Sequence, residues 1–184
     1  MNATEITAQI SNAANILNIN KWDYGASFSN DYSVQVDRGK AKQLKASQKQ
    51  VLTLRVWNQK NLVGITTTSD LSEKGIKKAL EQAYIASEFG NKNEFTDFSP
   101  LAKDPIQVKE IEKKHPLGIK KLLNILREAE SKLIESHEAI KSIPYNGLSE
   151  SFYERIYANS DGAFRNHSKS QAAIYLYARA EEKD

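Results

Sequence analysis

Apolar residues recur every three or four positions in three stretches of the chain, which is the spacing of one face of a helix. The first stretch covers residues 6–17 and ends at Asn18 and Asn20. The second covers 71–86, where Asp70 and Glu73 resemble an N-terminal capping pair. The third covers 119–136, with Pro116 in its first turn. Three amphipathic helices are therefore predicted.

The period changes to two between residues 24 and 68, which is typical of strands. Turns are predicted at 38–40, where Gly39 tolerates positive φ, and at 47–50 and 58–61. These turns divide the stretch into four short strands that form an antiparallel meander. In the strand 51–57, alternation places Leu54 on one face and Arg55 and Trp57 on the other.

The C-terminal part of the chain returns to strand patterning. A hairpin is predicted from two strands, 148–158 and 164–180, joined by a turn at 159–162. Residues 91–114 contain Pro100 and Pro105 and show no periodicity, so they are predicted to be a long surface connection.

The predicted fold class is α+β, an antiparallel β-meander packed with helices. The predicted organisation is a first segment at 1–90, holding a helix, the meander and a helix. A linker follows at 91–114, and a second segment at 115–184 holds a helix and the β-hairpin.

Composition excludes several kinds of site. The chain has 184 residues, 26 Lys and Arg against 23 Asp and Glu, a net charge of +3 and no cysteine. Disulfides, thiolate zinc sites and a cysteine nucleophile are therefore excluded. No apolar stretch is long enough to cross a bilayer, so no membrane partner is expected. The lack of cysteine fits a reducing compartment, and a cytoplasmic location is expected.

The pair His137-Glu138 begins like the zinc motif HExxH, but Lys141 stands where the second histidine would fall. Ser142 occupies the next position, so the spacing HExxxH fails as well. Two imidazoles on one helix face are needed for such a site. We expect no metal, no cofactor and no catalytic residue in this chain.

A basic strip offers another kind of site. Arg38, Lys40 and Lys42 share parity, and Lys45 lies close by, so an extended strand could present them to a polyanion. The alternative is an exposed strand whose lysines guard against aggregation. No aromatic residues alternate with these charges to stack on bases. The second interpretation is favoured, and nucleic acid is not the expected partner.

Three motifs carry a resemblance to a known family. They are the run from Tyr32 to Lys40, the run from Leu52 to Ser72 with its Thr-Ser-Asp-Leu-Ser segment, and the turn Ala158-Asn159-Ser160-Asp161-Gly162 before a long strand. In order and spacing they resemble the N-terminal domain of the TldD/PmbA family, also called modulators of DNA gyrase. The Thr-Ser-Asp-Leu-Ser form is closer to the PmbA (TldE) branch.

The resemblance implies a metallopeptidase system with two kinds of subunit. In that family the TldD subunit carries a zinc HExxxH motif in its C-terminal half, and the PmbA partner lacks working ligands. Members of the family are longer than this chain, which therefore resembles a truncated domain. No catalytic residue can be carried over to it, and zinc is expected only in the TldD-type subunit.

The resulting hypothesis is a non-catalytic domain that shapes a peptide-binding cleft or a subunit interface. Its partners would be a TldD-type subunit or a second copy of the chain, together with an extended peptide held at a sheet edge. Arg55 and Trp57, as exposed strand residues, are the candidate peptide contacts. The alternative is a nucleic-acid or gyrase-associated module that uses Arg38, Lys40, Lys42 and Lys45.

Overall fold

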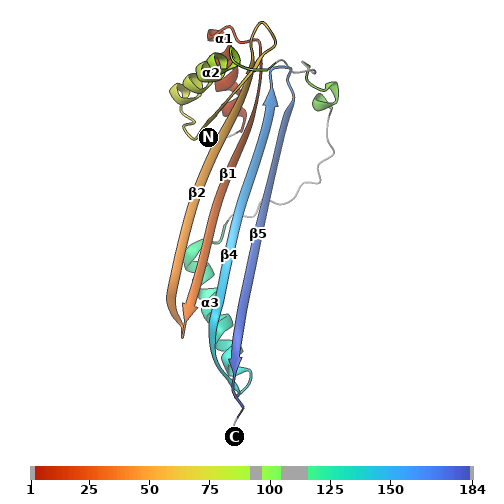
Figure 1. Cartoon of the computed structure of the whole chain (residues 1–184). Coiled ribbons are helices and arrows are strands. Elements are labelled where there is room, and N and C mark those ends of the chain that lie inside the picture. The colour runs from red at the N-terminus through yellow and green to blue at the C-terminus, as the bar shows by residue number, and fades with distance from the viewer. Residues whose placement is uncertain (1–2, 92–96, 105–115, 183–184) are drawn as a thin grey trace. The chain divides into compact units, whose positions relative to one another are not determined.

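The computed structural model describes residues 3–91, 97–104 and 116–182 (Figure 1). In chain order its elements are α1 (Ala3–Ile16), β1 (Lys21–Asp37), β2 (Lys40–Trp57), β3 (Val63–Thr68), α2 (Glu73–Ser87), the 3-10 helix η1 (Pro100–Lys103), α3 (Gly118–Glu135), β4 (Ile140–Asn159) and β5 (Phe164–Ala180). The three predicted α-helices are all present, and the strands form an antiparallel sheet, so the predicted α+β class is confirmed.

The sheet has five strands in the order β3-β2-β1-β4-β5. Arg38 and Gly39 both have positive φ, which confirms the predicted turn between β1 and β2. In the antiparallel pair of β2 and β3, Arg55 lies opposite Ile65 and Trp57 lies opposite Val63. Because β4 adjoins β1, the C-terminal hairpin and the meander belong to one sheet.

The predicted turn at 47–50 is wrong, because β2 runs unbroken from Lys40 to Trp57. The meander therefore has three strands, not four. The segment Ser-Gln-Lys-Gln is polar but contains no glycine, proline or asparagine, residues that favour a tight turn. Residues 40–51 of β2 are all exposed, so this part of the strand needs no alternating apolar residues and can be polar throughout.

The strand boundaries in the C-terminal part differ in one place. β5 spans the predicted residues 164–180, whereas β4 begins at Ile140, eight positions before the predicted start at Leu148. Pro144 and Gly147, which ordinarily interrupt strands, both lie within β4. A Cβ atom at Gly147 would approach the Tyr175 ring to 2.6 Å, so a larger residue there would displace that side chain.

The cap of α2 also differs from the prediction. The capping residue is Ser72, whose hydroxyl accepts the Gly75 N–H at 3.1 Å. Asp70 instead accepts the Ser72 N–H at 3.0 Å. The predicted connection at 91–114 lies mostly outside the described residues, and its described part contains η1.

Contacts divide the chain into two compact units, each assembled from separate stretches of sequence. Unit 1 comprises residues 1–28, 50–110 and 154–167, and unit 2 comprises 29–49, 111–153 and 168–184. The predicted segments 1–90 and 115–184 follow chain order instead, and their boundary stays a prediction. Each unit has its own hydrophobic core.

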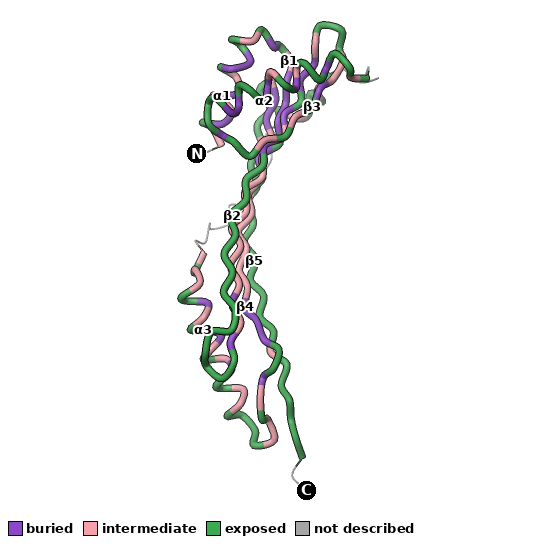
Figure 2. The backbone as a smooth tube through the Cα atoms, turned by 60° about the vertical axis from the view of Figure 1, so that its left-hand side comes forward, coloured by how far each residue is buried: buried purple, intermediate pink, exposed green. Residues whose placement is uncertain are grey.

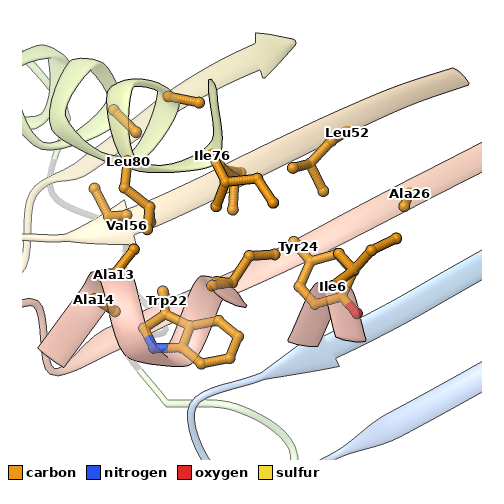
Figure 3. Close-up of a cluster of buried hydrophobic side chains, with 14 of the residues drawn as sticks. Ile6, Ala13, Ala14, Trp22, Tyr24, Ala26, Leu52, Val56, Ile76 and Leu80 are labelled. Atoms are coloured by element: carbon orange, nitrogen blue, oxygen red, sulfur yellow. The ribbon is translucent and has the colours of Figure 1, made fainter. Parts of the chain in front are cut away.

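The core of unit 1 lies between α1, α2 and one face of the sheet (Figure 2). Figure 3 shows Ile6 of α1 and Leu80 of α2 directed at the strand residues Tyr24 and Val56. The Tyr24 hydroxyl and the Thr7 hydroxyl are hydrogen-bonded at 2.6 Å, so the one polar atom of the buried ring has a partner. Burial nevertheless raises the pKa of Tyr24, because the phenolate would lose its hydration.

In unit 2, α3 covers the strands and its Leu122 and Leu126 pack on Val34, Val36 and Leu148. A buried carboxylate at Glu130 then joins α3 to the turn between β1 and β2. Its Oε1 accepts the Arg38 N–H at 3.2 Å and its Oε2 accepts the Gly39 N–H at 2.7 Å. Two consecutive N–H groups in left-handed residues form a concave anion site, which this carboxylate fills.

This hydrogen-bonding pattern leads to a prediction for Glu130→Gln. The amide keeps one acceptor oxygen but presents an NH2 group to a backbone N–H. The substitution should therefore cost about 1–3 kcal/mol of unfolding free energy. Glu128→Gln, at an exposed position of the same helix, is the matched control and should cost far less. Urea unfolding followed by circular dichroism measures both, and equal losses would contradict the assigned role of Glu130.

Candidate functional site

The side of the sheet opposite α1 and α2 in unit 1 carries the candidate site. Because Leu54 and Val56 enter the core, alternation along β2 directs Arg55 and Trp57 to the opposite side. Asp23 of β1 contacts Arg55, Lys21 of β1 lies over the Trp57 ring, and Tyr157 of β4 contacts Asp23. We call this set, Lys21, Asp23, Arg55, Trp57 and Tyr157, the open face.

An ion pair between Asp23 and Arg55 lies at the centre of the open face. Arg55 Nε donates to Asp23 Oδ1 at 2.8 Å, and Arg55 Nη2 donates to Asp23 Oδ2. The Asp23 side chain is 3% exposed, whereas that of Arg55 is 45% exposed. A carboxylate this deeply buried requires a paired cation. The bidentate geometry holds the guanidinium in one orientation across β1 and β2.

Tyr157 extends this network to β4. Its hydroxyl donates to Asp23 Oδ2 at 3.4 Å and accepts from Asn159 Nδ2 at 3.5 Å. The hydrogen bond from Arg55 to the Asp23 carboxylate raises the pKa of Arg55. Burial, and then the Asp23 charge, raise the pKa of Tyr157, so the phenol stays protonated at neutral pH. The network therefore holds one cation, one carboxylate and a neutral phenol donor.

Trp57 was predicted to be an exposed strand residue, and this part of the prediction is wrong. It is 7% exposed, because Phe98 packs edge-on against its ring with centroids 5.3 Å apart. Lys21 Nζ and Arg55 Cζ lie 5.5 and 5.4 Å from the ring centroid. The Trp57 indole N–H is buried and has no hydrogen-bond partner among the residues that the structure describes. Its predicted role in peptide binding stays a prediction.

The predicted basic residues lie in unit 2, and the structure does not present them as one row. Arg38 sits in the turn with φ of 49°, so it is not on the strand face assigned to it. Lys40, Lys42 and Lys45 are exposed on β2. Lys45 differs in parity from Lys40 and Lys42, so an extended strand directs it to the other side. Polyanion binding by these residues stays a prediction.

The histidines offer no cluster within the part of the chain that the structure describes. No group of three or more His, Cys, Asp or Glu side chains there could hold a metal ion. His137 Nδ1 accepts the Ala139 N–H at 3.1 Å, which is a local turn contact after α3. His115 falls outside the described residues. Among the described helices, none is long and apolar enough to cross a membrane.

Four members of this neighbourhood were missed from the sequence: Lys21, Asp23, Phe98 and Tyr157. Asp23 had a detectable signal, since an acidic residue between Trp22 and Tyr24 in a strand must lie on the face opposite two aromatic residues. Its pairing with Arg55 is a contact across strands, which periodicity within one strand does not reveal. Phe98 comes from the aperiodic connection, where the sequence pattern carries no contact information.

Two family models match the sequence. PmbA/TldA metallopeptidase domain 1 matches residues 25–87, and the PmbA/TldA metallopeptidase central domain matches residues 112–184. The two matches together span most of the chain, which therefore belongs to the PmbA/TldD family. The resemblance that the sequence motifs carried is confirmed. Comparison with curated proteins gives no match.

Solved structures share the fold. A proposed modulator of a DNA gyrase from Thermotoga maritima is 14% identical to this chain, with a TM-score of 0.72. The match covers 98% of this chain and 40% of the Thermotoga chain. TldE from Thermococcus kodakarensis is 15% identical, with a TM-score of 0.65. The match covers 95% of this chain and 40% of the TldE chain. A proposed modulator of DNA gyrase from Bacteroides thetaiotaomicron is 12% identical, with a TM-score of 0.72. The match covers 98% of this chain and 42% of the Bacteroides chain.

These comparisons differ in what they establish. At such identities the solved structures show a common fold, and the family assignment comes from the sequence matches. The chain spans about two fifths of the length of each of these structures. The family is one of metallopeptidases, and this chain matches its first and central domains.

The ion pair on the open face leads to a prediction for Arg55→Gln. Asp23 would remain buried without a cation, so unfolding free energy should fall by about 1–3 kcal/mol, less than for a fully buried pair because Arg55 is half solvated. Adding Asp23→Asn should recover part of this loss, since the unpaired charge disappears. Denaturant unfolding of the two single variants and the double variant measures the coupling. Strictly additive losses would contradict the pairing.

Proposed function

We propose that this chain is a non-catalytic part of a PmbA/TldD-type zinc metallopeptidase system, in which it holds an extended peptide at a sheet edge. The observation that carries the proposal is the match to the first and central domains of this family. The zinc and the hydrolytic chemistry belong, in this proposal, to a TldD-type partner subunit. The likeness to TldE supports a place as the companion subunit.

The edge strand β3 supports peptide binding in a specific way. It is an edge strand of the sheet, and among the described strands it pairs only with β2, through residues 63–68. Its sequence, Val-Gly-Ile-Thr-Thr-Thr, contains none of the lysines or prolines that usually block an exposed edge. An extended peptide can add to such an edge through backbone hydrogen bonds.

Residues of the open face lie beside this edge. Ile65 of β3 is opposite Arg55 in the register and is 55% exposed. A peptide paired with β3 would place alternate side chains on the same side of the sheet as Arg55. Arg55, at 45% exposure, retains solvent access while it pairs with Asp23. This arrangement supports the candidate role of Arg55 as a peptide contact.

The second edge strand supports the association of subunits. β5 lies at the other end of the strand order, and its Ile174, Tyr175 and Tyr177 are 49%, 44% and 64% exposed. Exposed apolar side chains on an edge strand are typical of an interface. In the proposal this surface meets a TldD-type subunit or a second copy of the chain. The proposed location is the cytoplasm.

The proposal makes a prediction about peptide backbone chemistry. A fluorescently labelled, unstructured peptide should bind the chain, as measured by anisotropy. N-methylation of alternate residues on its pairing side should weaken binding by about tenfold or more, because the N–H donors are lost. N-methylation on the opposite side of the same peptide is the control. Equal binding of both methylated peptides would contradict pairing at the sheet edge.

The alternative function is a nucleic-acid or gyrase-associated module that uses Arg38, Lys40, Lys42 and Lys45. The observation in its favour is that these residues are all exposed. This alternative predicts that DNA affinity falls steeply with salt. A plot of the logarithm of the binding constant against the logarithm of the salt concentration should have a slope of about −0.9 per phosphate contacted. A triple variant with Lys40, Lys42 and Lys45 replaced by Gln should flatten that slope. Absence of binding at low salt, or an unchanged slope, would exclude it.

A further inference from the structure

A short segment of the chain lies against the open face of unit 1. Residues 97–104, which we call the strap, include η1 and contact this unit near both of their ends. At one end Asp97 pairs with Lys21 at 3.2 Å and Phe98 packs on Trp57. At the other end the carbonyl of Asp104 accepts from Arg165 Nη2 at 2.6 Å.

The contacts at Asp97 and Phe98 define a site with two complementary parts. Lys21 supplies a cation for a carboxylate, and the Trp57 ring supplies an apolar surface for an aromatic side chain. Lys21 Nζ also lies 5.3 Å from the Phe98 centroid and 5.5 Å from that of Trp57, so one cation serves both parts. An acidic residue followed directly by an aromatic one fills this site.

The strap satisfies the site only in part. The Asp97 side chain is 95% exposed, and an ion pair in that position contributes little to stability. The Trp57 indole N–H is buried and donates to no acceptor in the described part of the chain. A buried donor without an acceptor favours any occupant that supplies a carbonyl oxygen there. A separate peptide that brings both an acidic–aromatic pair and such a carbonyl can therefore displace the strap.

We propose that Lys21 and Trp57, with Arg55 beside them, form a subsite for an acidic–aromatic pair in a bound peptide. The chain's own Asp97 and Phe98 occupy this subsite until such a peptide displaces them. This inference rests on the proposed function and adds sequence preference to it. The sheet edge binds the backbone of one stretch of the peptide, and the subsite selects two adjacent side chains in a stretch beyond the paired strand, where side chains need not alternate between faces.

The test uses Trp57 fluorescence in the full chain. Trp22→Phe leaves Trp57 as the single tryptophan. In that background Phe98→Ala should shift the emission to the red, because the indole loses its cover. The probe is a capped Gly/Ser peptide with one central Asp-Phe pair, and it should restore the blue emission. It should bind the Phe98→Ala chain about tenfold more tightly than the parent chain, since the internal competitor is gone.

Matched controls address the chain and the probe separately. Leu101→Ala changes a strap side chain that is 72% exposed, and it should alter neither emission nor affinity. Probes with Lys-Phe or Asp-Ala in place of Asp-Phe should bind about tenfold more weakly. Lys21→Gln should remove the preference for Asp-Phe over Asn-Phe. Equal binding of all probes, or equal affinity of the parent and Phe98→Ala chains, would overturn the subsite.

A second measurement avoids the Trp22 substitution. In the unsubstituted chain, the Trp57 indole N–H resonance should move downfield when the Asp-Phe probe supplies an acceptor, and an unmoved resonance with bound probe contradicts the subsite. The two proposals fail differently. Probes that bind regardless of the Asp-Phe pair overturn the subsite and leave edge binding intact. If no probe binds any chain, both proposals are wrong.

Discussion

The buried carboxylate of Asp23 is the constraint on which the open face of unit 1 depends. A charge that is almost fully removed from water is tolerable only with a cation and hydrogen-bond donors against it. Arg55 meets this requirement from β2 and Tyr157 meets it from β4. Three neighbouring strands are thereby joined through side chains as well as through the sheet's backbone hydrogen bonds. The same pairing holds the Arg55 guanidinium beside the Trp57 ring.

The two faces of the sheet in unit 1 have separate roles. The face under α1 and α2 is apolar and supplies the core, where Leu54 and Ile76 are fully buried. The opposite face carries charges and aromatic rings whose contacts are specific but whose exposure is greater. In unit 2 the corresponding organising contact is Glu130, which joins α3 to the turn between β1 and β2. Each unit thus combines an apolar core with a buried carboxylate, Asp23 in unit 1 and Glu130 in unit 2.

Much of the fold could be predicted from periodicity, because helical and strand spacings are local properties of the sequence. The three helices, the turn at Gly39 and the residues of β5 followed in this way. The continuous β2 did not, since a polar strand in an exposed position has no apolar alternation to reveal it. β4 was predicted too short because Pro144 and Gly147 have the composition of a loop.

The candidate site was less accessible to sequence reasoning, for a physical reason. Arg55 and Trp57 were identified because their parity opposes that of Leu54, which is a property of one strand. The burial of Trp57 depends on Phe98, which lies about forty residues away in an aperiodic segment. The ion pair of Asp23 and Arg55 depends on the register between two strands. Contacts of this kind follow from the tertiary fold, so a single sequence carries no local signal for them.

We propose that this member of the PmbA/TldD family holds a peptide along β3 and across the open face. Hydrogen exchange of the full chain, with and without the Asp-Phe probe, tests it most directly. Amides of residues 63–68 should exchange more slowly with the probe bound, because the free edge gains partners. Amides of the strap at 97–104 should exchange faster as that segment is displaced. If the probe binds but neither slows exchange in β3 nor speeds exchange in the strap, peptide binding along β3 and across the open face is contradicted.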